Sequence, residues 1–107
     1  MNKTLAYCLL AALGLTSAAA PALAQDWPSK PITFVVGYPA GGPVDALARA
    51  LGQRLSAELK QPVVIDNKPG ANEIVASQFV ARSKPDGYTL LVSTEAPLTQ
   101  NQFLYKK

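Results

Sequence analysis

The chain has 107 residues and a formal charge of +3, from ten Lys and Arg against seven Asp and Glu. This length allows at most one small domain. There is no histidine, and the only cysteine, Cys8, lies in an apolar N-terminal stretch after Tyr7, where a lipoprotein site would need a small residue. The basic residues are scattered rather than gathered in a stripe with aromatic residues between them. The composition therefore supports neither a lipid anchor nor nucleic-acid binding.

The first 24 residues have the pattern of a secretory signal peptide. Lys3 gives a positive start, and residues 5–15 form an uncharged apolar run that is too short to span a bilayer. Ala22-Leu23-Ala24 is the small-x-small sequence that signal peptidase requires. A buried helix of the domain fits these features less well. We predict cleavage after Ala24, which leaves an exported mature chain, residues 25–107, that is not inserted in the membrane.

Beyond an exposed, proline-rich lead-in, the mature chain alternates between strand and helix patterns. The expected elements are a strand at 32–36, a helix from Pro43 that ends before Pro62, a strand at 63–65, a helix from about 73 to 82 and a strand at 88–92. The connections between strands are too long for hairpins, which implies parallel strands joined by right-handed crossovers, with helices on the faces of the sheet. The predicted fold class is α/β, in the order β-α-β-α-β.

The first helix is predicted to bury one apolar stripe against the sheet. Proline suits its first turn, where the missing N–H would have no partner anyway. Six apolar residues then follow at three- and four-residue steps: Val44, Leu47, Ala48, Leu51, Leu55 and Leu59.

Ligands of open parallel sheets bind outside the carboxyl ends of the strands. Three loops lie there, at residues 38–42, 67–72 and 93–95. In the first, Gly41-Gly42 stands directly before a helix, where bare backbone can approach a ligand and free N–H groups favour an anion. A tight strand-to-helix turn would explain the same glycines equally well.

The polar residues of these loops also have two interpretations each. Asp45, at the third helical position, is expected to stabilise the helix dipole rather than to contact an anion. Asn67 and Asn72 fit loop and capping roles better than ligand contacts. Thr94 suits capping and ligand contact equally, and Tyr38 suits either packing or the wall of a pocket.

Several enzyme classes are excluded by the residues that are missing. Gly37 and Gly42 have the glycine spacing of a phosphate-binding loop, but Pro43 and Val44 replace its lysine and its hydroxyl residue. Without histidine or a mature cysteine, the usual pairs of nucleophile and base cannot be built. The carboxylates Asp45, Asp66, Glu73 and Glu95 are spread without the spacing of metal ligands. We predict a binding protein rather than an enzyme, with no metal and no cofactor.

Four stretches stand out together along the mature chain. They are WPSKPI at 27–32, AGGPVD at 40–45 with Ala48-Arg49, NKPGA at 67–71 and KPDGYTLL at 84–91. In this order and spacing they resemble the Bug-type receptors of tripartite tricarboxylate transport systems, and the resemblance covers residues 26–105. It implies part of the first lobe of a type II periplasmic-binding-protein fold.

The resemblance further implies a periplasmic receptor that captures a small organic carboxylate and delivers it to the membrane subunits of a transporter. An orphan carboxylate-binding module that is not coupled to a transporter is the alternative. One ligand carboxylate would be held largely by backbone groups of the first two loops. The residues that the resemblance puts near the ligand are Tyr38, Ala40, Gly41, Gly42, Val44, Ala71, Asn72 and Thr94, with structural support from Asp45, Asn67 and Gly70.

Two departures from the family pattern affect these expectations. Asn72 and Glu73 stand where such receptors usually have glycines, and Glu73 brings a negative charge and a side chain beside the expected anion. The chain also ends at Lys107, where such receptors continue into a second lobe. We therefore expect a truncated copy in which the second lobe is absent.

Overall fold

The computed structural model describes residues 26–105, so the predicted signal peptide lies outside the described part of the chain. Its elements are β1 (Ile32–Val36), α2 (Pro43–Leu59), β2 (Val63–Asn67), α3 (Ile74–Ala81), β3 (Thr89–Val92), a π-helical turn η1 (Ala96–Gln100) and α4 (Asn101–Leu104). The predicted alternation of strands and helices is confirmed. Sequence patterns gave no assignment to the segment that forms η1 and α4.

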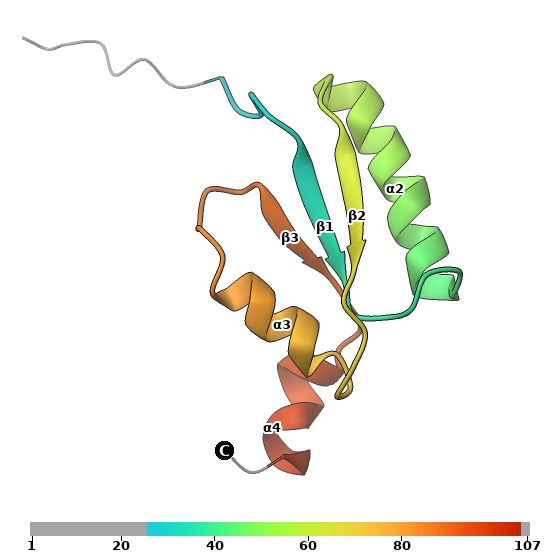
Figure 1. The fold of residues 1–107 in the computed structure, drawn as a ribbon, viewed down its shortest axis with the longest axis vertical. Helices are drawn as coiled ribbons and strands as arrows, with labels where there is room; N and C mark the ends of the chain where they lie inside the picture. The colour runs from blue at the N-terminus through green and yellow to red at the C-terminus, as the bar shows by residue number, and fades with distance from the viewer. Residues whose placement is uncertain (1–25, 106–107) are drawn as a thin grey trace, which may run out of the picture.

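The three strands form one parallel sheet in the order β2-β1-β3, and their arrowheads point the same way in Figure 1. Phe34 of β1 stands opposite Ile65 of β2 and Leu90 of β3. Because β2 and β3 lie on either side of β1, right-handed crossovers put α2 and α3 on opposite faces of the sheet. The predicted α/β fold class is confirmed.

The central strand β1 forms the core. Val35 and Val36 are both 0% exposed, and consecutive residues of a strand point to opposite faces. Both faces of β1 are therefore covered, by α2 on one and by α3 on the other, while β2 and β3 pair with its two edges. Ile32 and Phe34 are also buried. This double burial explains the nearly continuous apolar run at the start of the mature chain.

The buried face of α2 differs from the predicted stripe. Ala48 and Gly52 face the sheet and are buried, whereas Leu47 and Leu51 are 64% and 47% exposed. A Cβ atom added at Gly52 would lie only 3.1 Å from Cγ1 of Val63. The small residues let α2 approach β2 closely, which moves the two leucines to the rim of the contact. The prediction that both leucines are buried was wrong.

The end of β2 also differs from the expected one. β2 continues through Asp66 to Asn67, so Asn67 ends a strand rather than beginning a loop. The chain then turns through Gly70 and three consecutive non-glycine residues with positive φ (Ala71, Asn72 and Glu73) before α3 begins.

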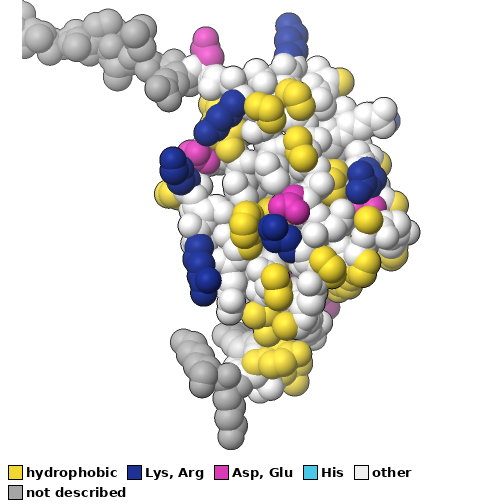
Figure 2. Space-filling model, in the orientation of Figure 1, with side chains coloured by type: hydrophobic (Ala, Val, Ile, Leu, Met, Phe, Trp, Pro, Cys, Tyr) yellow, Lys and Arg dark blue, Asp and Glu magenta, His cyan; other side chains and the backbone are white. Residues whose placement is uncertain are grey.

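Exposed apolar side chains gather at the C-terminal end of the described chain. Phe103 is 84% exposed and Leu98 is 72% exposed, and Figure 2 shows this patch at the foot of the molecule. At the opposite end, the lead-in packs on the turn before β3, where the Trp27 and Tyr88 rings lie 6.0 Å apart. No helix among residues 26–105 is long and apolar enough to cross a membrane.

Candidate functional site

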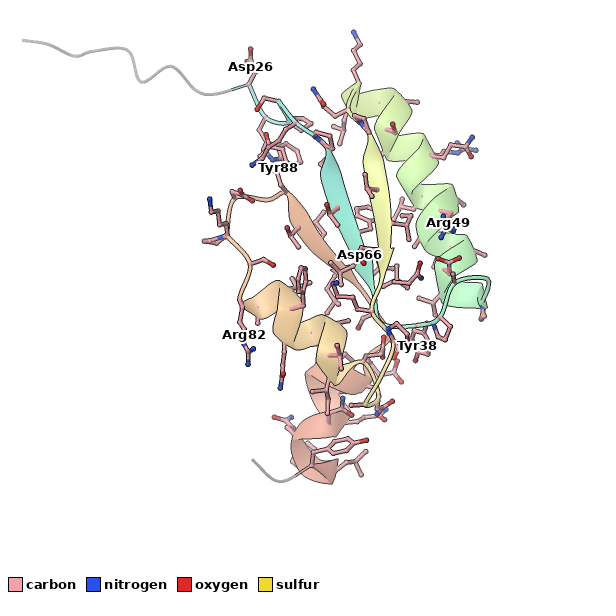
Figure 3. The ribbon with its side chains drawn as sticks, in the orientation of Figure 1. Asp26, Tyr38, Arg49, Asp66, Arg82 and Tyr88 are labelled. Atoms are coloured by element: carbon pink, nitrogen blue, oxygen red, sulfur yellow. The ribbon has the colours of Figure 1, made fainter. Side chains whose placement is uncertain are left out.

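The carboxyl ends of the three strands bring the predicted loops to one edge of the sheet. Figure 3 shows Tyr38 at the foot of the sheet, where β1 ends and the chain turns toward α2. Thr94 follows β3, and its Oγ1 atom lies 3.4 Å from the Tyr38 hydroxyl oxygen. Asn67 of β2 donates from Nδ2 to the Tyr38 carbonyl oxygen at 3.0 Å. The predicted site residues Tyr38, Asn67 and Thr94, which are widely separated in sequence, are thus brought together.

The first loop leads into α2 through two glycines with different backbone conformations. Gly41 has a φ of +90°, which side-chain-bearing residues rarely adopt, whereas Gly42 has an ordinary extended conformation with a φ of −82°. Gly42 is the N-cap of α2 and cannot offer a side-chain cap. The N–H groups of Val44 and Asp45 have no acceptor one turn earlier in the helix, so this end of α2 is suited to an anion.

Asp45 has a structural role at the start of α2. Its carboxylate accepts three hydrogen bonds of 2.9 Å, from the Gly41 N–H, Arg49 Nε and Asn67 Nδ2. These bonds tie the first loop to the helix and to β2. The ion-paired hydrogen bond from Arg49, followed by the bonds from Gly41 and Asn67, holds the pKa of Asp45 well below its ordinary value. Because Arg49 pairs with this charge, Asp45 opposes a nearby anion less than an unpaired aspartate would.

The second loop directs Asn72 toward the C-terminal segment. Asn72 Nδ2 donates to Asn101 Oδ1 at 2.7 Å, and Asn101 Nδ2 donates back to the Asn72 carbonyl oxygen at 2.8 Å. Asn101 is only 7% exposed. The Asn72 amide, which the resemblance puts near the ligand, therefore joins the second loop to the start of α4. Ala71 of the same loop is exposed, as is Ala40 of the first.

Glu73 is the buried acceptor among the strand-end loops. It is 2% exposed, and its side chain accepts hydrogen bonds from the Thr94 N–H at 3.1 Å, from Thr94 Oγ1 at 2.5 Å and from the Tyr38 hydroxyl at 3.4 Å. The Glu73 side chain, which was expected beside the anion, points inward and joins two of the predicted ligand residues.

Sequence reasoning did not identify Arg49 and Asn101 as parts of this arrangement. Arg49 follows Asp45 by one helical turn, and an acidic residue four positions before an arginine is a recognisable pairing signal. Asn101 offers no such signal, because its partner Asn72 lies on a different loop far away in the sequence.

The fold and the site together define a class of protein. Parallel strands that end in loops around a helix N-terminus match solved structures described as a periplasmic transporter and as the periplasmic binding protein BugD, so the described residues have part of the periplasmic-binding-protein fold. Residues 47–107 match the family described as the tripartite tricarboxylate transporter family receptor, TctC. The chain belongs to this family. The resemblance inferred from the sequence motifs is confirmed.

Similar proteins support this assignment at the level of sequence and of structure. A UPF0065 protein of Bordetella bronchiseptica is 50% identical over 90 residues, which are 84% of this chain and 27% of that protein. The Rpa4515 structure from R. palustris with adipate is 38% identical, with a TM-score of 0.73 over 77% of this chain and 27% of that one. MatC from Rhodopseudomonas palustris with bound malate is also 38% identical, with a TM-score of 0.58 over 61% and 22% of the two chains. The chain thus spans about a quarter of the length of these relatives.

Proposed function

We propose that this protein is a periplasmic receptor that captures a small organic carboxylate and passes it to the membrane subunits of a tripartite tricarboxylate transporter, without converting it chemically. The observation that carries the proposal is the start of α2, which has no side-chain cap and follows the carboxyl end of the central parallel strand. Gly42 begins the helix there. Family membership supports the receptor role.

The start of α2 is the part of the site best suited to a carboxylate. Its first-turn N–H groups point out of the helix, and the helix dipole favours a negative charge there. Gly42 has no side chain to block the approach, and the charge of Asp45 is offset by Arg49 at 2.9 Å. The residues proposed to lie near the ligand are Tyr38, Ala40, Gly41, Gly42, Val44, Ala71, Asn72 and Thr94. Of these, Tyr38 and Thr94 donate hydrogen bonds from their hydroxyl groups to Glu73.

The proposed ligand class follows from the relatives. Two solved structures that resemble this chain are described with adipate and with malate, both small dicarboxylic acids. We extend that class, and not either compound, to this protein. The proposed location is the periplasm, reached by export with cleavage after Ala24.

The test is a calorimetric titration of the mature protein with a panel of small mono-, di- and tricarboxylates. We expect saturable binding of at least one of them. Gly42→Val should weaken that binding at least tenfold, because the new side chain covers the helix start. The fold should tolerate it, since an added Cβ would lie 3.6 Å from the nearest atom, the Pro39 carbonyl oxygen.

Ala50→Val is the matched control, since it introduces the same side chain at an exposed position of α2 away from the loops. Equal affinity of the Gly42→Val and Ala50→Val variants would contradict a site at the helix start. Absence of binding to every acid of the panel would contradict the proposed function itself.

A further inference from the structure

Glu73 fills a space at the strand ends that only glycine leaves open. A Cβ atom added at Gly37 would meet Cγ of Glu73 at 2.7 Å and its Cβ at 2.9 Å, closer than real Cβ contacts come. The Glu73 side chain therefore lies directly against the backbone at the end of β1. It is 2% exposed, which is unusual for a glutamate.

The groups around the Glu73 carboxylate are those that would hold the carboxylate of a bound acid. A backbone N–H and a hydroxyl of Thr94 donate to its two oxygens, and the Tyr38 hydroxyl donates to one of them. The ion pairs of residues 26–105 involve other carboxylates, so Glu73 is held by neutral donors alone. A buried charge without a counter-ion depends on such hydrogen bonds.

The backbone at Glu73 also favours a different residue. Its φ is +67°, in the left-handed region where glycine is favoured, and the two residues before it have positive φ as well. A glutamate side chain is thus present at a position where its backbone conformation is disfavoured, and the contacts of its carboxylate offset that cost.

We propose that Glu73 acts as a built-in ligand, a carboxylate of the protein itself that occupies an acid-binding position formed by Tyr38, Thr94 and the backbone at Gly37. This inference rests on the proposed function, because it concerns which acids the proposed receptor can capture. While Glu73 is in place, a dissolved acid cannot put a carboxylate against Tyr38 and Thr94. It is left with the N–H groups at the start of α2, so Glu73 restricts which acids the protein accepts.

The experiment truncates the Glu73 side chain and supplies the removed atoms as a small dissolved acid. Glu73→Ala removes the atoms of one acetate ion, and Glu73→Gly removes those of one propionate ion. We expect acetate to raise the melting temperature of Glu73→Ala, and propionate that of Glu73→Gly, in a saturable manner. A tenfold excess over the dissociation constant should give a rise of about 6 °C or more in a domain of this size.

Three controls separate occupation of the site from general effects of added salt. Wild-type protein should not respond to either acid, because its position is filled. Acetamide and propionamide, which have the same shape without the charge, should have little effect on the variants, and sodium chloride at equal concentration should have none. Thr94→Val added to Glu73→Ala should weaken the response to acetate at least fivefold, since it removes one donor.

The outcomes decide the inference in each case. If the variants are unfolded, restoration of their circular dichroism signal by the matched acid supports it, and failure of both acids to restore folding overturns it. An equal response of wild type, or an equal response to the amides, also overturns it. Because acetate is used on a variant, a positive result stands even if the wild type binds no acid of the calorimetric panel, so the two proposals can fail separately.

Discussion

The two glycines before α2 should respond very differently to the same substitution. At Gly41 the φ of +90° makes any side chain strained although no atom lies within 4 Å of an added Cβ. Such strain costs about 1–3 kcal/mol, and about 0.4–1 kcal/mol is regained because the unfolded chain loses freedom. We therefore expect Gly41→Ala to lower the free energy of unfolding by about 1–2 kcal/mol. The melting temperature of a domain of this size would fall by roughly 4–15 °C.

Gly42→Ala provides the comparison one residue later. Its φ of −82° is ordinary, and an added Cβ would lie 3.6 Å from the Pro39 carbonyl oxygen, a normal van der Waals contact. We expect a change in stability within about 0.5 kcal/mol, typical of a surface substitution. Urea denaturation followed by circular dichroism measures both variants under the same conditions. Equal destabilisation by the two substitutions would refute the assignment of strain to Gly41 and of bare, unstrained backbone to Gly42.

Three further predictions test the packing, the charge network and the export of the chain. Gly52→Leu should destabilise the fold by about 1–3 kcal/mol in urea melts, because even an added Cβ would lie only 3.1 Å from Cγ1 of Val63. Ala50→Leu, on the exposed face of α2, should be nearly neutral. The low pKa of Asp45 adds stability that is present above its unfolded pKa of about 4 and is lost as the pH falls through and below that value. The melting temperature should therefore fall at acidic pH, and Asp45→Asn should flatten this dependence; an unchanged slope would show that other carboxylates cause it. Mass spectrometry of the exported protein should find Gln25 as the N-terminal residue, and an intact Met1 on that protein would contradict cleavage after Ala24.

The sheet could be predicted from the sequence because β1 is buried on both faces. That burial requires an uninterrupted apolar run, and no helix pattern competes with Ile32–Val36. The stripe on α2 was less predictable. Periodicity identifies an apolar side of a helix, but the small residues Ala48 and Gly52 decided which line of that side approaches the sheet.

The candidate site was predictable in its position but not in its contacts. Strand ends and a glycine pair located the loops, since parallel strands bring their carboxyl ends to one edge. The inward turn of Glu73 depends on the absence of a side chain at Gly37, and the position of Asn72 depends on Asn101. Both are relations between residues far apart in the chain, and no local pattern contains them.

The strand order also has a consequence for how the chain is made. Among the elements of residues 26–105, β1 is the first to be synthesised and the one that needs two neighbours. It pairs with Val63–Asn67 and Thr89–Val92, which leave the ribosome later. Contacts between such distant segments form slowly, because a long loop must close before any pairing is gained. During synthesis the apolar strand β1 therefore stays unpaired until β2 has emerged. Its other edge, which pairs with β3, stays exposed for longer. Until then, a chaperone that binds the nascent chain would protect this strand from aggregation.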